Sequence, residues 1–218
     1  MKWIAKLFIV VSLAVLFLPA CAVDREFQVG LTYWPSTALR SYYTFKEPPS
    51  IALAPFTDNR TERKLLFKRY NNLGGEDFYY LKDERLDKEF AVSIKRGLEE
   101  AGIKVIDIPS WDRSADGFTA MTVNGILTGT IEEFSCKRDV GASPLFPALV
   151  GKARLRLYWG DKQGRLIKED ILEAKFQSEE FLFITEAGIE HILNLVMADL
   201  VEKTVKSKAV SEIIKGNL

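Results

Sequence analysis

Histidine and cysteine, which carry out chemistry in many enzymes, are sparse in this sequence, with one His and two Cys. His191 is the only histidine, so a histidine-based zinc site or a Ser–His–Asp triad would have to include it. It lies mid-way along a segment with helical periodicity, beside an apolar stripe, which is typical of a residue at the boundary of a core. Gly74-Gly75 lacks the spacing, and the following Lys-Ser/Thr, of a phosphate-binding loop.

Carboxylates are the other candidates, because two nearby carboxyl groups can act as general acid and base. Glu132-Glu133 and Glu179-Glu180 are adjacent pairs. Neighbouring residues of a strand point to opposite faces, so we expect neither pair to form a dyad. A hydrolase of cell-wall polymer would have to use Asp58 or Glu76-Asp77, which lie in a long segment without clear periodicity. The sequence therefore predicts a protein that is not an enzyme, with no catalytic residue, cofactor or metal site.

The stretch from Met1 to Asp24 predicts where the protein functions. Lys2 and Lys6 provide a short positive region, residues 7–18 carry no charge, and small residues follow. This is the layout of a secretory signal peptide. The apolar run is shorter than the roughly 20 residues that span a bilayer. We therefore expect residues 1–20 to direct export and then to be removed.

The residues at the expected cleavage site point to a lipid anchor. Leu18-Pro19-Ala20-Cys21 resembles the lipobox of bacterial lipoproteins. The resemblance implies that Cys21 becomes the mature N-terminus, with a diacylglycerol on its sulfur and an acyl chain on its nitrogen. Three acyl chains hold a protein firmly, because each buried methylene contributes about 0.8 kcal/mol. Ala22, rather than Asp, follows the cysteine, which in that family implies the outer membrane, with the domain facing the periplasm.

Other outcomes of export remain open. Ala20-Cys21-Ala22 also fits ordinary signal peptidase, which would release a soluble periplasmic protein, either a binding protein or a cell-wall hydrolase. The segment could also stay as an uncleaved anchor. If Cys21 is not acylated, a disulfide to Cys136 becomes possible; if it is acylated, Cys136 has no partner in the chain. We expect Cys136 to be a buried strand residue.

Composition indicates one folded domain without a nucleic-acid partner. The chain has 30 basic and 30 acidic residues, and loss of Lys2 and Lys6 leaves a small acidic excess. Nucleic-acid binders show a basic excess or stripe instead. The mature length fits one domain of roughly 100–200 residues. We expect a tether at 21–50 and a single α+β domain at 51–218. The tether contains an aromatic cluster, Tyr42, Tyr43 and Phe45, which we expect to pack on the flank of the domain or to contact a partner, with a short strand at 42–45.

Hydrophobic periodicity predicts the elements of this domain. They are a strand at 50–56, a helix at 84–101 with Asp83 as N-cap and Gly102 after its end, strands at 103–108 and 121–136, a hairpin with arms at 151–160 and 171–177, and a helix at 186–206 capped by Thr185. The alternating basic and acidic residues of the hairpin indicate a solvated face with cross-strand ion pairs. The order predicts an α+β two-layer sandwich, with two helices on one face of a mostly antiparallel sheet.

Residues 57–81 show no clear period. They are predicted to form a long irregular segment, or to contain one short helix at 64–70. Long loops without regular structure are usually functional, and this one interleaves basic with aromatic residues. We therefore expect Arg60, Phe67, Tyr70 and Phe78 to contact a partner.

Several short motifs together resemble a known group of proteins. They are the lipobox, a first strand SIALAPFTDNR, a helix ending in Ala-Gly, a GTIEEF strand, a hairpin around YWGDKQG and a closing helix. This combination resembles the YajG-like bacterial outer-membrane lipoproteins. More loosely, the order of elements is similar to LptE, the lipopolysaccharide-assembly lipoprotein, and to auxiliary lipoproteins of lipid-transport ABC systems. The resemblance transfers no functional residue, but it implies a non-catalytic envelope lipoprotein that binds a protein or lipid partner in the periplasm.

Overall fold

The structure is a computed structural model of the 218-residue chain. It describes residues 23–34, 36–40, 42–71, 74–83, 85–115, 122–139, 148–178 and 184–215. Within these ranges the chain forms two β-sheets and three α-helices. The expected signal peptide, Cys21 and Glu179-Glu180 lie outside the described residues.

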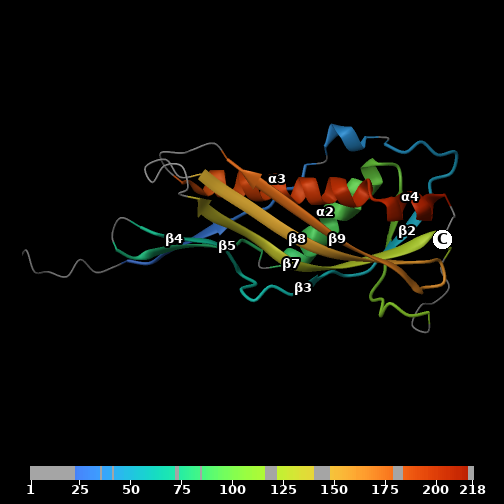
Figure 1. The fold of residues 1–218 in the computed structure, drawn as a ribbon, viewed down its shortest axis with the longest axis horizontal. Coiled ribbons are helices and arrows are strands. Elements are labelled where there is room, and N and C mark those ends of the chain that lie inside the picture. Colours follow the sequence, from blue (N-terminus) through green and yellow to red (C-terminus); the bar gives the residue numbers. More distant parts are fainter. Residues whose placement is uncertain are drawn as a thin grey trace, which may run out of the picture.

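The larger sheet has six strands (Figure 1). They are β2 (Ser50–Leu53), β3 (Thr57–Asp58), β6 (Lys104–Asp107), β7 (Gly125–Asp139), β8 (Ala148–Gly160) and β9 (Leu166–Gln177). The order across the sheet is β6-β2-β7-β8-β9, and β3 also pairs with β7. β2 runs parallel to both of its neighbours, whereas the long strands β7, β8 and β9 are antiparallel. The predicted hairpin is β8–β9.

The helices cover one face of this sheet. They are α2 (Leu86–Glu100), α3 (Glu186–Val205) and α4 (Lys208–Ile214). α3 packs on β8 and β9, and α2 packs on β6 and on α3. The predicted apolar stripe of α2, Leu86, Phe90, Ile94 and Leu98, is at most 1% exposed. Burial of such side chains stabilises the fold by about 1.5–3 kcal/mol each. The predicted α+β class is confirmed.

Gly151 of β8 sets how closely the sheet and α3 approach each other. A Cβ at this position would lie 2.5 Å from Ile192 Cγ2 and 2.9 Å from Val196 Cγ2. No real Cβ is found that close to a neighbouring carbon, so only glycine permits this contact.

A smaller sheet of three strands lies beside the larger one (Figure 1). Its order is β1 (Arg25–Val29), β5 (Glu76–Leu81) and β4 (Leu65–Tyr70). β1 is parallel to β5, and β4 is antiparallel to it. Its inner side chains, including Val29, Phe67 and Tyr79, belong to the same core cluster as α2, α3 and β8. The two sheets therefore share one core.

The prediction of an irregular segment at 57–81, and the alternative helix at 64–70, are wrong. The segment contains β3, β4 and β5, and among its described residues only 59–64, 71 and 74–75 are irregular. The register of β4 against β5 shifts between Leu65 and Phe67, so Leu66 and Phe67 are consecutive and both buried. The irregularity interrupts the alternation by which a strand is recognised.

The described part of 21–50 is more ordered than the expected tether. Residues 25–29 form β1, and Tyr33 and Leu39 are buried, the latter in a short 3-10 helix η1 (Thr37–Leu39). The strand expected at 42–45 is absent from the described residues there: residues 42 and 43 form a bend, and 44 and 45 have no regular structure. Tyr43 and Phe45 stack at 5.7 Å and pack against the core, and Tyr43 Oη donates to Val205 O at 3.2 Å. Packing on the flank of the domain is confirmed for Tyr43 and Phe45, whereas Tyr42 is 47% exposed.

The helix ends agree in part with the sequence. Thr185 caps α3 by accepting a hydrogen bond from Gly188 N at 3.2 Å, and Gly102 follows α2 with φ of +90°. Asp83 does not cap α2, because the chain is still turning there after β5. The N-cap is Arg85, which offers no side-chain acceptor.

Candidate functional site

Arg60 is a structural residue rather than a partner contact. Only 8% of it is exposed, and its guanidinium donates to both carboxylate oxygens of Asp58, at 3.0 and 2.9 Å. It also donates to Phe134 O at 2.9 Å and to the carbonyl of Arg63. These bonds fasten the segment after β3 to β7, so a partner cannot reach this arginine.

Phe67 is likewise a core residue. It is 2% exposed, and its ring lies 5.3 Å from that of Tyr79 on the inner face of the smaller sheet. The expectation that it contacts a partner is corrected, because Phe67 pairs with Tyr79, and both side chains are buried on the inner face.

Tyr70 and Phe78 lie on the opposite, outer face of the smaller sheet. This outer face consists of Glu26 and Gln28 of β1, Lys68 and Tyr70 of β4, and Glu76, Phe78 and Tyr80 of β5. Tyr70 is 80% exposed. The rings of Phe78 and Tyr80 are stacked, with centroids 6.2 Å apart and planes 7° from parallel. Lys68 Nζ lies 3.5 Å from Glu76 Oε1. The outer face is thus an aromatic strip among charged side chains.

The inner face of the same sheet contains a cluster in which one buried carboxylate, that of Asp77, is surrounded by hydrogen-bond donors. Asp77, fully buried, accepts two hydrogen bonds from Arg25, both at 2.8 Å, one from Arg69 at 3.0 Å and one from Asn71 at 3.1 Å. Burial alone would raise the pKa of Asp77, but these hydrogen bonds outweigh it and lower the pKa to about 2. Arg69 also donates to Ile184 O at 2.8 Å, beside the start of α3. The cluster ties β1, β4 and α3 to β5.

This geometry opposes a hydrolase built on the candidate carboxylates. Asp58 is held by Arg60, Glu76 by Lys68 and Asp77 by Arg25 and Arg69. Glu76 and Asp77 lie on opposite faces of β5. A carboxyl group with a pKa near 2 stays ionised at neutral pH and cannot serve as a general acid there.

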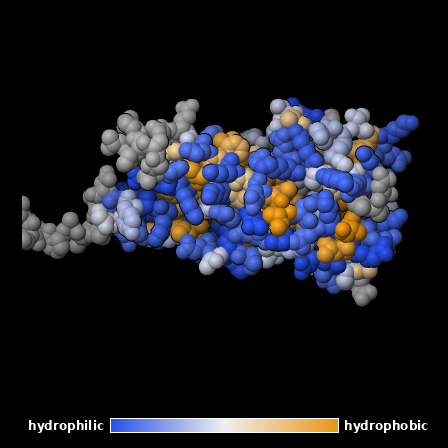
Figure 2. All heavy atoms as spheres, viewed as in Figure 1, coloured by the Kyte–Doolittle hydropathy of each residue, from blue (hydrophilic) through white to orange (hydrophobic). Residues whose placement is uncertain are grey.

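The outer face of β7, β8 and β9 contains the predicted cross-strand ion pairs. Arg156 pairs with Glu132 at 2.6 Å and with Glu169, and Arg154 pairs with Glu132 at 3.0 Å and Glu173 at 3.6 Å. On the side of the molecule shown in Figure 2, hydrophilic residues predominate and apolar residues form separate small patches.

Glu132 and Glu133 do not point to opposite faces as predicted. The register of β7 against β8 shifts between Ile131 and Glu133. Glu133 is the register partner of Arg154, and Glu132 forms an ion pair with the same Arg154, so this bulge places both carboxylates on the charged face. Glu132 is neutralised by two arginines there, which leaves no acid–base dyad.

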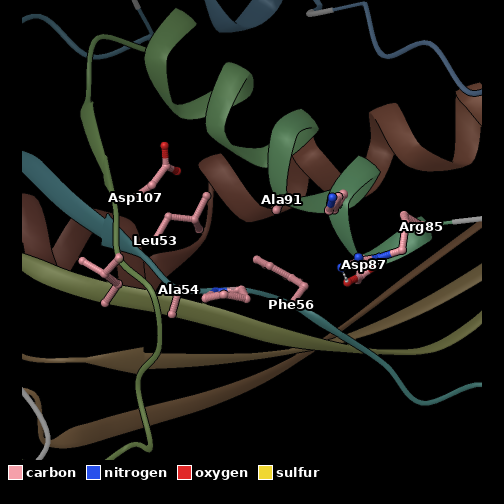
Figure 3. Close-up of a pocket in the computed structure, with 10 residues that line it drawn as sticks. Leu53, Ala54, Phe56, Arg85, Asp87, Ala91 and Asp107 are labelled. Carbon is pink, nitrogen blue, oxygen red and sulfur yellow. Dashed lines mark hydrogen bonds and ion pairs between the residues drawn. The ribbon is translucent and has the colours of Figure 1, made fainter. Parts of the chain in front are cut away.

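A small cavity lies where β2 and β6 end and α2 begins (Figure 3). Its volume is about 260 Å³, and Leu53, Ala54, Phe56 and Ala91 form its apolar wall. Arg85 and Asp87 at its rim form an ion pair at 2.7 Å. The volume is below the roughly 300–1,000 Å³ of most small-molecule sites. Among its described lining residues there is no histidine, cysteine or serine that could act as a nucleophile.

The remaining candidates occupy ordinary positions. Cys136 is a buried residue of β7, as predicted, and burial raises the pKa of its thiol to about 12. His191 is exposed on α3. The described ranges contain no group of three or more His, Cys, Asp or Glu side chains placed to hold a metal ion. None of the helices in the described part of the chain is both long enough and apolar enough to cross a membrane.

Sequence reasoning missed Tyr80 and the partners of Asp77. The alternation in Glu76–Leu81 contained a signal for Tyr80, because Phe78 and Tyr80 are two residues apart and share a face of the strand. No local signal could connect Arg25 with Asp77, which are 52 positions apart.

Comparison with known proteins supports the fold and no more. No protein-family model matches the chain, and no curated protein matches it in sequence. The DUF330-family protein XCC0632 of Xanthomonas campestris is similar in structure, with a TM-score of 0.53 and 10% identity over 88% of this chain and 99% of that one. A putative neuraminyllactose-binding hemagglutinin homolog of Helicobacter pylori has a TM-score of 0.51 and 13% identity over 87% and 98%. At such low identity, these similarities show a shared fold alone.

Proposed function

We propose that this protein is a non-catalytic envelope lipoprotein. Acylated Cys21 anchors it to the outer membrane, and the domain in the periplasm binds a protein or lipid partner. The lipobox and the short apolar run of residues 7–18 support the anchor. The observation that carries the binding role is the outer face of the smaller sheet, where three aromatic side chains lie on two adjacent strands.

The composition of this outer face fits an interaction surface. Aromatic residues are enriched at protein interfaces, and Tyr in particular provides a large contact area at a low cost in conformational entropy. Phe78 and Tyr80 are already stacked, so binding would not have to order them. Lys68, Glu76 and Glu26 surround them as a polar rim.

The anchor is tested by the intact mass of the protein purified from membranes. We expect a mature chain that begins at Cys21 with three acyl chains, and loss of that mass in the Cys21→Ala variant. A chain that begins at Val23 without lipid would support the soluble periplasmic alternative. Clearing of peptidoglycan in a zymogram would then favour a hydrolase, and its absence a soluble binding protein.

The binding surface is tested by site-specific photocrosslinking in cells. A photoreactive phenylalanine analogue at position 78 or 80 should yield a defined crosslinked product, whereas the same analogue at Ile171 should not. Ile171 is 43% exposed on β9 and so is a matched surface control. Equal crosslinking at all three positions, or none, would contradict a role for the outer face.

A further inference from the structure

The described N-terminus is fastened to the turn that joins β4 and β5. Asn71 Nδ2 donates to Val23 O at 2.8 Å, and Asp24 Oδ1 accepts from Glu76 N at 2.8 Å. A Cβ at Gly75 would lie 2.4 Å from Val23 O, so the backbones of the N-terminus and the turn are in close contact. This end of the smaller sheet therefore cannot move independently of Val23.

The sequence limits how far this turn can lie from the anchor. Only Ala22 separates Val23 from Cys21. Since each residue spans at most about 3.6 Å, the Cα atoms of Cys21 and Val23 are at most roughly 7 Å apart. The acyl chains on Cys21 enter the bilayer, so the turn must lie at the membrane surface.

Tyr70 is the last residue of β4 and immediately precedes this turn. It is the most exposed large apolar side chain in the described part of the molecule, at 80%. Lys68, two residues earlier on the same outer face, is also exposed. Tyrosine has an apolar ring with a polar tip and is enriched at the interface between membrane and water. The lysine stem can lie along the membrane with its ammonium among the phosphates.

We propose that Tyr70 inserts into the headgroup region of the membrane that holds Cys21, as a second point of attachment. The proposal rests on the proposed function, because it requires an acylated Cys21. Two points of attachment fix an orientation, whereas a lipid anchor alone leaves the domain free to tumble. Figure 1 shows β4 and β5 toward one end of the long axis and α4 toward the other. In this orientation the smaller sheet lies at the membrane surface, and α4 and the β8–β9 turn point away from the membrane.

Fluorescence quenching by lipids tests this orientation. The lipidated protein is reconstituted into vesicles of phosphatidylethanolamine and phosphatidylglycerol that contain brominated lipid. An environment-sensitive thiol label is attached to Lys68→Cys or, as a control, to Leu166→Cys beside the β8–β9 turn. Cys21 is acylated and Cys136 is buried, so neither reacts with the label.

We expect strong quenching at position 68, little at position 166, and loss of most of the quenching at 68 when Tyr70→Ser is added. Vesicle-bound protein with equal quenching at both positions would overturn the proposal. Quenching at 68 that is unchanged by Tyr70→Ser would also overturn it, and would leave Tyr70 available to a protein partner. Protein without acyl chains, recognised by its mass and its failure to float with the vesicles, would instead contradict the proposed function.

Discussion

Arg25 and Asp77 form a two-bond ion pair that joins the first and fifth strands of the chain, with both N–O distances at 2.8 Å. The carboxylate is fully buried, whereas 45% of the arginine side chain is exposed. β1 is a five-residue edge strand, which is also held by its pairing with β5 and by the stacking of Phe27 on Tyr79 at 4.8 Å. The pair therefore adds a buried charged contact to those that hold β1 on the sheet.

Asp77→Asn should destabilise the protein. The amide keeps the shape of the side chain but removes the negative charge that Arg25 and Arg69 share. Removing one partner of a fully buried ion pair costs about 3–5 kcal/mol, and the partial exposure of both arginines lowers our expectation to roughly 2–3 kcal/mol at neutral pH. Urea unfolding measures this, with Glu76→Gln as the control on the outer face. Equal midpoints for the two variants would show that the cluster does not stabilise the fold.

The lowered pKa of Asp77 also predicts that the free energy of unfolding depends on pH. The pKa of Asp77 is lowered from 3.8 to about 2 in the folded state, so the unfolded state binds the proton more readily. Its stabilisation is fully present above about pH 4 and is lost as the pH falls toward 2, by roughly 2 kcal/mol in total. The difference in unfolding free energy between wild type and Asp77→Asn should shrink over this interval. A constant difference would mean that Asp77 has an ordinary pKa.

Phe67 and Phe78 should respond differently to truncation. Phe67→Ala removes a buried ring from the core and should cost about 3–4 kcal/mol. Phe78→Ala removes a half-buried ring from the outer face and should cost less than about 1 kcal/mol, since little core packing is lost. Chemical unfolding of both variants measures the difference. A large loss of stability in Phe78→Ala would show that the outer face is needed for folding. Loss of binding in variants of this face could then result from unfolding.

Two glycines that lie close to or within α3 should also differ in how they respond to substitution by alanine. Gly151→Ala would place a methyl group 2.5 Å from Ile192 Cγ2, which should push α3 away from β8 and cost about 1–3 kcal/mol. Gly188→Ala, in the first turn of α3, would place it 3.4 Å from Thr185 Oγ1, an ordinary contact. This second change should be neutral or stabilise by up to about 1 kcal/mol, because alanine favours the helix. Melting temperatures of the two variants should therefore move apart, and a fall of equal size in both would contradict the packing described for Gly151.

Cys136 should be unreactive in the folded protein. Its thiol has a pKa of about 12, so only ~0.01% is thiolate at pH 8, and the side chain is 3% exposed. Iodoacetamide should label it only after denaturation, at one free thiol per chain if Cys21 is acylated. A denatured, unreduced chain without a free thiol would instead indicate a disulfide to Cys21.

The sequence predicted best those elements whose side chains alternate without interruption. Leu155, Leu157 and Trp159 alternate with polar residues along β8, and all three are fully buried. Prediction failed where a register shift made two consecutive residues face inward, as at Leu66 and Phe67 in β4. There the period of two disappears from the sequence although the strand persists.

The candidate site was predictable only in part, for a related reason. Tyr70 and Phe78 were predicted from residue type to contact a partner, and both do lie on the outer face. Whether an aromatic or basic residue faces outward depends on its partners across the sheet. Arg60 is basic and lies between polar residues, yet it is buried because Asp58 and the carbonyl of Phe134 satisfy its guanidinium. Pairings across 74 positions of the chain leave no pattern that can be read locally.

The place of β2 in the sheet has a consequence for how the chain folds. Ser50 pairs with Lys104 on one side, and Ile51 pairs with Gly125 on the other. Because synthesis proceeds from the N-terminus, the apolar strand Ser50–Leu53 exists long before either of its neighbours. Non-local pairing of this kind is slow, and an unpaired apolar strand is a template for aggregation. The β8–β9 hairpin needs no such delay, since its arms pair across one short turn. Until residues 104–107 and 125–127 have been synthesised, β2 is therefore the segment most exposed to aggregation.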